Sequence, residues 1–130
     1  MVHKFTVSSS LREELIDITG EVSRFIASSG MTEGVCFAYT PHTTAGLTIN
    51  ENADPAVRGD ILKGLSALNL ERVHFAHREG NSPAHIKSSL MGCSLFVLVE
   101  KGAAVLGTWQ GIYFCEFDGP RKRTVILKSG

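Results

Sequence analysis

The C-terminal part of the chain is a series of short apolar runs, each followed by a turn, and this pattern restricts the fold more than any other feature. The runs cover residues 94–100, 104–109, 112–117 and 124–128. Glycine-containing turn sequences separate them at 101–102, 110–111 and 118–120. Because connections this short join antiparallel strands, we expect a β meander of antiparallel neighbours.

Strands and helices are mixed in the part that precedes this region. Residues 2–8, 34–39 and 47–50 have strand patterns. Asp54 caps a helix with Pro55 at its first position. The buried face of that helix is expected at Val57, Ile61, Leu65 and Leu68. A short helix begins at Ser82 and runs to about Met91. The fold class is therefore α+β, with antiparallel sheets packed as a β-sandwich or partial barrel and a few helices.

Residues 14–19 are compatible with either a strand or a helix. Ser10 and Glu13 have the spacing of a capping box, but a helix from there would contain Gly20 at a cost of about 1 kcal/mol. We therefore expect an extended segment first and then a helix that is capped by Thr19 and ends at Gly30. The apolar stripe of this helix is Val22, Phe25 and Ile26.

Length and composition indicate one globular domain, residues 1–130, in the cytoplasm. Lysine plus arginine equals aspartate plus glutamate at 13 each, so no bulk charge favours nucleic acid or an anionic membrane as a partner. No apolar run has the length of a signal peptide or a membrane span. The three cysteines, Cys36, Cys93 and Cys115, match no zinc or redox spacing and are expected to be buried thiols in a reducing compartment.

The segment 41–54 is the first of two in which polar side chains are concentrated. It contains His42, several threonines, two amides and two carboxylates. Asp54 has a sufficient structural task as a helix cap, whereas Glu51 has no obvious local task and is a candidate catalytic residue. Thr43 and Asn50 are candidate ligand-binding residues, although threonines here also suit a turn.

The segment 74–87 is the second polar segment. His77 precedes a turn and His85 lies one turn into the helix, so the two imidazoles can converge with His42 as ligands of zinc or magnesium. No spacing typical of a metal motif accompanies them, and a lone histidine is more often structural. Candidate residues for catalysis and phosphate binding follow in the same segment: Glu79, Asn81, Ser82 and Lys87. The helix N-terminus at Ser82 favours an anion.

Two polar residues in the aromatic stretch 106–121 also require an explanation. Gln110 lies at an expected turn, and Glu116 lies within an apolar strand, where a carboxylate needs a partner or an outward face. A partner across a subunit boundary is one solution. The cationic run 121–123 is interpreted as a solvated strand edge.

Three sequence blocks together resemble the YjbQ-like family, often labelled secondary thiamine-phosphate synthase. The blocks are residues 42–54, residues 79–81 with 84–87, and residues 107–121. Their order and spacing fit the family over nearly the whole chain. The family pattern often has tyrosine near position 75, where this chain has Phe75, so no hydroxyl is available there.

The resemblance implies an α+β fold, a homotrimer with pockets near subunit boundaries, and weak thiamine-phosphate synthase activity on small phosphorylated molecules. That reaction couples a pyrimidine-methyl pyrophosphate to a thiazole phosphate. It implies site roles for His42, Glu51, His77, Glu79, Asn81, His85, Gln110 and Glu116. Two alternatives are a metal-dependent hydrolase of a small phosphorylated substrate, in which a metal-bound water attacks, and a non-catalytic metal- or metabolite-binding protein.

Overall fold

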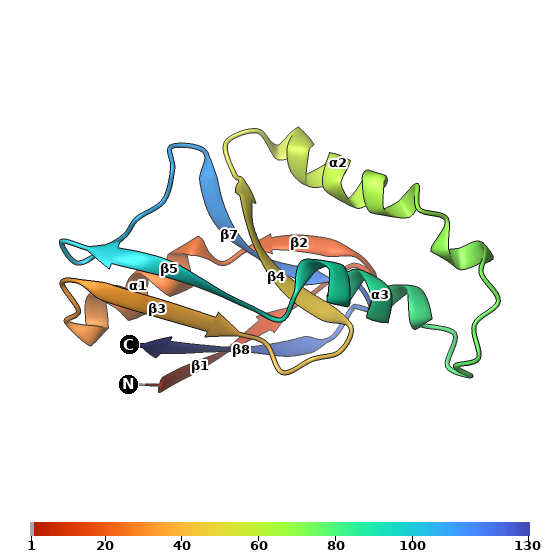
Figure 1. Cartoon of the computed structure of the whole chain (residues 1–130), viewed down its shortest axis with the longest axis horizontal. Helices are drawn as coiled ribbons and strands as arrows, with labels where there is room; N and C mark the ends of the chain where they lie inside the picture. Colours follow the sequence, from red (N-terminus) through yellow and green to blue (C-terminus); the bar gives the residue numbers. More distant parts are fainter. Residues whose placement is uncertain (1) are drawn as a thin grey trace.

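The computed structural model describes residues 2–130, which form two antiparallel sheets and their covering helices (Figure 1). One sheet has the order β1-β8-β3-β5-β6 and the other β2-β7-β4. The elements are β1 Val2–Ser8, β2 Glu14–Asp17, α1 Thr19–Ser29, β3 Gly34–Tyr39, β4 Ala45–Glu51, α2 Pro55–Ser66, η1 Leu70–Arg72, α3 Ser82–Met91, β5 Ser94–Glu100, β6 Ala103–Ala104, β7 Gln110–Glu116 and β8 Lys122–Ser129. This architecture confirms the expected α+β class.

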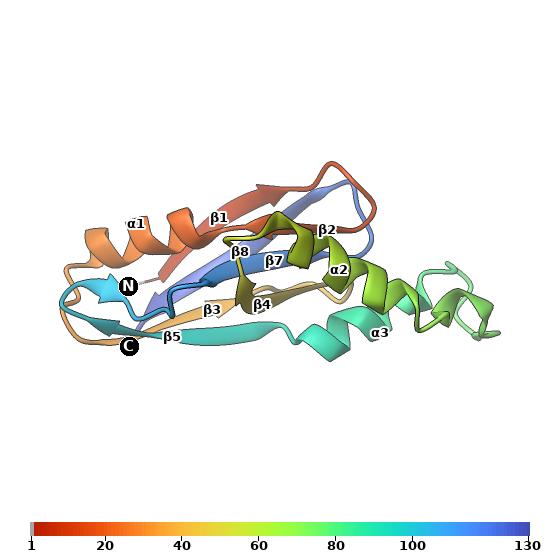
Figure 2. The same ribbon diagram turned by 90° about the horizontal axis from the view of Figure 1, so that it is seen from above.

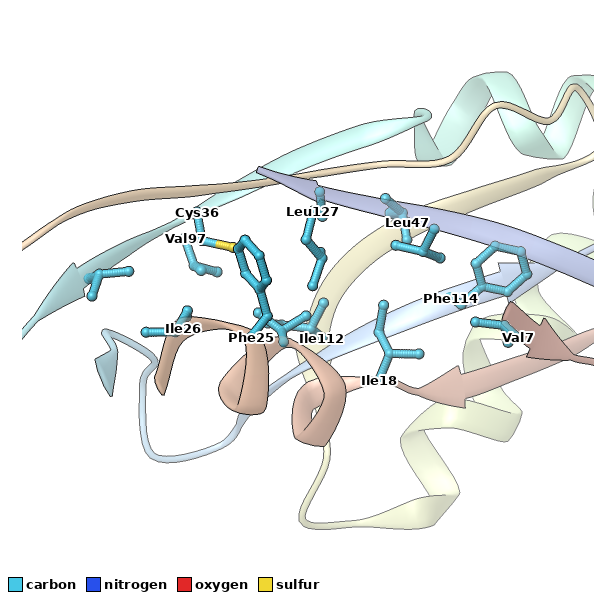
Figure 3. Packing of buried hydrophobic residues seen from close by; sticks show 14 of the residues in the cluster. Val7, Ile18, Phe25, Ile26, Cys36, Leu47, Val97, Ile112, Phe114 and Leu127 are labelled. Atoms are coloured by element: carbon cyan, nitrogen blue, oxygen red, sulfur yellow. The ribbon is translucent and has the colours of Figure 1, made fainter. Parts of the chain in front are cut away.

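The main core lies between the two sheets and against α1 (Figure 3). Strand residues enter it at every second position, as Val125 and Leu127 do on β8. Helix α1 contributes Val22, Phe25 and Ile26, the stripe that the 3.6-residue period predicts. The two sheets therefore pack as a sandwich, with their inner faces buried together.

Strand β7 is buried on both faces, which sets it apart from the other strands. A second cluster of apolar residues lies on its other side, where Leu15, Tyr113 and Cys115 meet α3 and partly buried residues of α2. Figures 1 and 2 show α2 and α3 extending beyond the sheets at the end away from both termini. None of the helices within residues 2–130 combines the length and apolar composition that crossing a membrane requires.

The expected C-terminal meander is wrong in two respects. Residues 105–109 form a loop, and only Ala103–Ala104 pair with β5. Strand β7 then begins at Gln110, because the turn closes earlier, where the Gly107 N–H donates to Gln110 Oε1 and the Gln110 N–H to the Gly107 carbonyl. The loop carries the chain to the second sheet, and the turn after Glu116 returns it, so β7 pairs with β4 and β2 instead of β8.

Other local expectations are confirmed in part. Gly30 ends α1 with a left-handed φ of 72°, and Asp54 caps α2 by accepting the Ala56 N–H at 2.9 Å. Thr19 is the first residue of α1 and not its cap; its hydroxyl accepts the Ile112 N–H at 2.8 Å. The expected buried face of α2 is confirmed in part: Val57, Ile61 and Leu65 are partly buried, and the latter two pack against the second cluster. Leu68 is exposed beyond the end of the helix.

The three cysteines have different environments. Cys36 and Cys115 are buried, and burial raises the pKa of Cys36 and raises that of Cys115 to about 12. Cys93 is exposed, contrary to the expectation of three buried thiols, because it lies between the end of α3 and the start of β5.

Candidate functional site

A cleft of about 400 Å³ lies where three connecting segments meet beside α3. The segments are the loop that enters β4, the loop that enters α3 and the turn that enters β8; Figure 1 shows all three near α3. The residues that line the cleft are Pro41, His42, Thr43, Thr44, His77, Glu79, Asn81, His85, Asp118, Arg121 and Arg123. Both polar segments of the sequence therefore contribute to one cavity.

His77 and His85 form the histidine pair of the cleft. Their ring centroids are 5.6 Å apart in an edge-to-face arrangement, and His77 Nε2 is 3.9 Å from Glu79 Oε1. The pair comes together because Gly80, with φ of 76°, turns the chain between His77 and the start of α3. Two imidazoles beside a carboxylate offer both hydrogen-bond donors and acceptors to a polar ligand.

His42 has a different environment from the other two imidazoles. Its Nε2 accepts the backbone N–H of Thr124 at 2.9 Å, while the Thr40 hydroxyl donates to the Thr124 carbonyl at 2.8 Å. Partial burial and the positive charges of Arg123 and Arg121 lower the pKa of His42, against the opposing effect of Glu116. The lowered pKa favours the neutral imidazole of His42.

Asp118 connects two walls of the cleft. Its Oδ2 accepts from Asn81 Nδ2 at 3.0 Å and from the Arg121 guanidinium at 3.3 Å. The Arg121 side chain remains 51% exposed, so it can also contact a ligand. Asn81 Oδ1 is buried without a hydrogen-bond partner in the described part of the chain. A half-exposed guanidinium and an amide oxygen without a hydrogen-bond partner give the cleft the capacity to bind a polar molecule.

Glu116 and Arg123 form a fully buried ion pair behind the cleft, with side-chain exposures of 0% and 2%. The guanidinium donates to both carboxylate oxygens, and Ser9 and the Asp118 N–H donate as well. Burial alone raises the pKa of Glu116, but these hydrogen bonds outweigh it and hold the pKa below its ordinary value. The partner that this strand carboxylate required lies in the same chain, and the pair leaves it no access to solvent.

Asn50, Glu51 and Gln110 lie at the far end of β4 and β7, where Glu51 and Gln110 are paired in register. The extended chain of β4 places them roughly 15–20 Å from its start at Ala45, which follows the cleft residue Thr44. Each side chain serves its own loop: Glu51 Oε2 accepts two backbone N–H groups before α2, and Asn50 Oδ1 accepts the N–H of Glu51. The cleft of a single chain therefore does not contain these three candidates.

Lys87 and Ser82 also lie outside the cleft lining. Lys87 is 5% exposed in its side chain, and its ammonium pairs with Glu13 at 2.5 Å. Ser82 lines a smaller neighbouring cavity of about 210 Å³. At the N-terminus of α3, Pro83 has no N–H, and the N–H groups of Ala84 and His85 both donate to the Asn81 carbonyl. Few donors remain there for an anion.

The expected three-histidine metal site does not fit this arrangement. Within residues 2–130, no three side chains of histidine, cysteine, aspartate or glutamate are grouped so that they could hold a metal ion. Moreover, the Nε2 lone pair of His42 already accepts a hydrogen bond. The imidazoles of His77 and His85 remain available to form hydrogen bonds with a bound molecule.

The residues that sequence reasoning missed are mainly Asp118, Arg121 and Arg123. The cationic run was interpreted as a solvated strand edge, but Arg123 is buried with Val125 and Leu127 on one face of β8. The period-2 alternation of that strand was visible in the sequence and would have placed Arg123 on the inner face.

The chain matches a family model described as "UPF0047 protein YjbQ-like" over residues 3–129. It is 52% identical over 128 residues to UPF0047 protein MJ1081 of Methanocaldococcus jannaschii, covering 98% of this chain and 93% of that protein. It is 50% identical to UPF0047 protein YugU of Bacillus subtilis, with 98% of each chain covered.

Solved structures agree with these matches. A yjbq/upf0047 family protein of Clostridium acetobutylicum has a TM-score of 0.96 and 48% identity, covering 98% of this chain and 99% of that one. A hypothetical protein of Aeropyrum pernix has a TM-score of 0.94 and 36% identity, covering 100% and 98%. The fold, the sequence and the family model together show that this chain belongs to the UPF0047 YjbQ-like family, whose function is uncharacterised.

Proposed function

We propose that the cleft binds small phosphorylated substrates and that the chain is a weak thiamine-phosphate synthase. The observation that carries the proposal is the convergence of His77, His85 and Arg121 in one cavity of about 400 Å³. That volume is within the range of small-molecule sites. The activity itself is the one that the family resemblance implies.

The reaction requires stabilisation of a leaving group. The thiazole nitrogen attacks the methylene carbon of the pyrimidine; a C–N bond forms, the C–O bond breaks, and pyrophosphate leaves with the electron pair. Arg121 supplies positive charge and donors for the pyrophosphate oxygens. His77 and His85 donate hydrogen bonds to the leaving oxygen, and Glu79 lies 3.9 Å from His77 Nε2.

A divalent ion, zinc or magnesium, belongs to this proposal as a companion of the pyrophosphate. It would neutralise charge on the leaving group. Because a three-histidine site does not fit the cleft, the ion would be held by oxygens of the substrate, which leaves the imidazoles of His77 and His85 free to donate hydrogen bonds. No other step depends on it.

The test is formation of thiamine phosphate from the two precursors with added magnesium. We expect activity in the wild-type protein and a loss of at least tenfold in the variants His85→Ala and Arg121→Ala. His74→Ala is the matched control, because His74 is exposed in the same loop and lines none of the cavities described above. No product above background would contradict the synthase. Pyrophosphate binding without turnover would favour a non-catalytic binding protein.

We further propose that the chain associates with itself, as a homotrimer according to the resemblance. Support comes from the outer face of the five-stranded sheet, where Phe37 and Phe96 are opposite each other in register and 47% and 58% exposed. Tyr39 and Leu98 extend this apolar patch. Contiguous exposed apolar residues on neighbouring strands are typical of protein interfaces. A monomeric mass of the wild-type protein in light scattering would contradict self-association. If the patch forms the interface, Phe96→Ser should have a lower measured mass than the wild-type protein.

A further inference from the structure

The end of β3 leaves Thr124 of β8 without a partner strand on the β3 side, although Thr124 is paired with Thr6 of β1 on the other side. Two side chains take the place of β3 there. The pairing of β3 with β8 ends at Tyr39 and Ile126. Two residues further along β8, the N–H of Thr124 donates to His42 Nε2 and its carbonyl accepts from the Thr40 hydroxyl. The imidazole of His42 therefore continues the ladder beyond the point at which the strand leaves the sheet.

This hydrogen bond determines where the proton of His42 resides. A backbone N–H can only donate to a nitrogen with a free lone pair, and an imidazolium has none. A neutral imidazole has one such nitrogen. With Nε2 accepting from Thr124, the ring proton is on Nδ1. Burial and the positive charges of Arg123 and Arg121 oppose a second proton on the ring, against the effect of Glu116.

The Nδ1 side of His42 faces open space. His42 lines the cleft of about 400 Å³ and also an adjoining cavity of about 500 Å³, which it shares with His85. In the part of the chain that the structure describes, no hydrogen bond to Nδ1 is present, and the atom is not among the buried polar atoms without a partner. It is accessible to a ligand.

We propose that His42 is held as its Nδ1–H tautomer and acts as a fixed, neutral hydrogen-bond donor to an acceptor oxygen of the ligand. The role differs from those of His77 and His85, whose rings accept no backbone N–H within residues 2–130 that would fix a tautomer. The donor role rests on the proposed function of the cleft, whereas the tautomer rests on the hydrogen bond with Thr124 alone.

The tautomer is tested by long-range ¹H–¹⁵N correlation spectra of protein labelled with ¹⁵N-histidine, with no ligand present. We expect His42 to show a protonated Nδ1 and an unprotonated Nε2 at pH 7, with His42→Gln identifying its signals. A proton on Nε2, or on both nitrogens at that pH, would overturn the proposal. This readout is independent of any activity of the protein.

The donor role is tested by titrating pyrophosphate, with magnesium, into the wild-type protein and two variants. The amide oxygen of His42→Gln can still accept the Thr124 N–H, but the variant has no donor at the Nδ1 position; His42→Ala loses both contacts. We expect His42→Gln to keep the melting temperature of the wild type and to bind pyrophosphate about tenfold or more weakly, the loss expected for one hydrogen bond to a charged acceptor. His42→Ala should lose stability as well.

The outcomes separate the two proposals. Unchanged pyrophosphate affinity in His42→Gln would overturn the donor role. A wild-type protein that does not bind pyrophosphate, yet has Nδ1 protonated, would remove the proposed function and with it the donor role, while the tautomer would stand.

Discussion

Replacing Glu116 by glutamine removes one charge from the most buried ion pair of the molecule and changes little in shape. The carboxylate accepts hydrogen bonds from Arg123, Ser9 and the Asp118 N–H. In Glu116→Gln, the guanidinium of Arg123 stays buried, retaining Thr44 as a hydrogen-bond partner but no counter-charge. Removing one partner of a buried pair costs about 3–5 kcal/mol.

That magnitude is large for a chain of this size. Domains of comparable length have free energies of unfolding of about 5–15 kcal/mol. A loss of 1 kcal/mol lowers the melting temperature by about 4 °C, so we expect a decrease of about 10–20 °C. Urea unfolding followed by far-UV circular dichroism measures the free energy. All variants are compared at one protein concentration, because self-association would make stability depend on it.

A double-mutant cycle isolates the pair itself. Arg123→Met and the double variant Glu116→Gln/Arg123→Met complete the cycle, and we expect the double variant to be about 2–3 kcal/mol more stable than the sum of the single losses predicts. A Glu116→Gln protein within about 1 kcal/mol of the wild type would refute the reasoning. So would strictly additive losses.

Acid provides a second measurement of the same pair. The pKa of Glu116 is lower in the folded protein than its ordinary value of 4.5, so the folded state binds this proton more weakly than the unfolded state. The stabilisation is complete above the ordinary value and is lost as the pH falls through the folded pKa. The difference in stability between wild type and Glu116→Gln should therefore decrease when the pH is lowered from 7 to below 4. A difference that stays constant would contradict the assignment.

Three further predictions concern other parts of the molecule. Glu13→Gln should destabilise the protein by about 2–3 kcal/mol and Lys87→Met by less in urea unfolding, because Lys87 is 5% exposed and cannot regain water, whereas Glu13 is 24% exposed; equal losses would contradict this. Gly46→Ala should cost about 1–3 kcal/mol, since its Cβ would lie 2.8 Å from a backbone oxygen, whereas Gly64→Ala, with open space in α2, should raise the melting temperature. In the folded protein, Cys93 should react with Ellman's reagent while the two buried thiols react after unfolding, so that more than one fast equivalent would refute the burial pattern.

The local signals of the sequence determined most of the elements, because they depend on neighbours along the chain. Alternation predicted β1, and glycine marked the end of α1 at Gly30. Aspartate followed by proline marked the start of α2 at Asp54, and serine followed by proline that of α3 at Ser82. Histidine and asparagine residues on loops next to these elements then came together in the cleft, since the loops flank one helix.

Only the tertiary structure decided which sheet each strand joins. A run such as residues 110–116 shows that a strand is buried, but an apolar pattern does not encode whether its partner is the next strand or one far away in sequence. The loop at 105–109 and the turn at 118–121 place β7 in the other sheet.

That crossing has consequences for the site that no local pattern contains. It brings Glu116 against Arg123 as a structural pair, and it places Gln110 and Glu51 at the opposite end of β4 from the cleft. It also brings Asp118 and Arg121 to the cleft wall. The types of the side chains identified the candidate site residues. The distances among these residues follow from strand pairings between segments far apart in the sequence, and only the packed sheets determine those pairings.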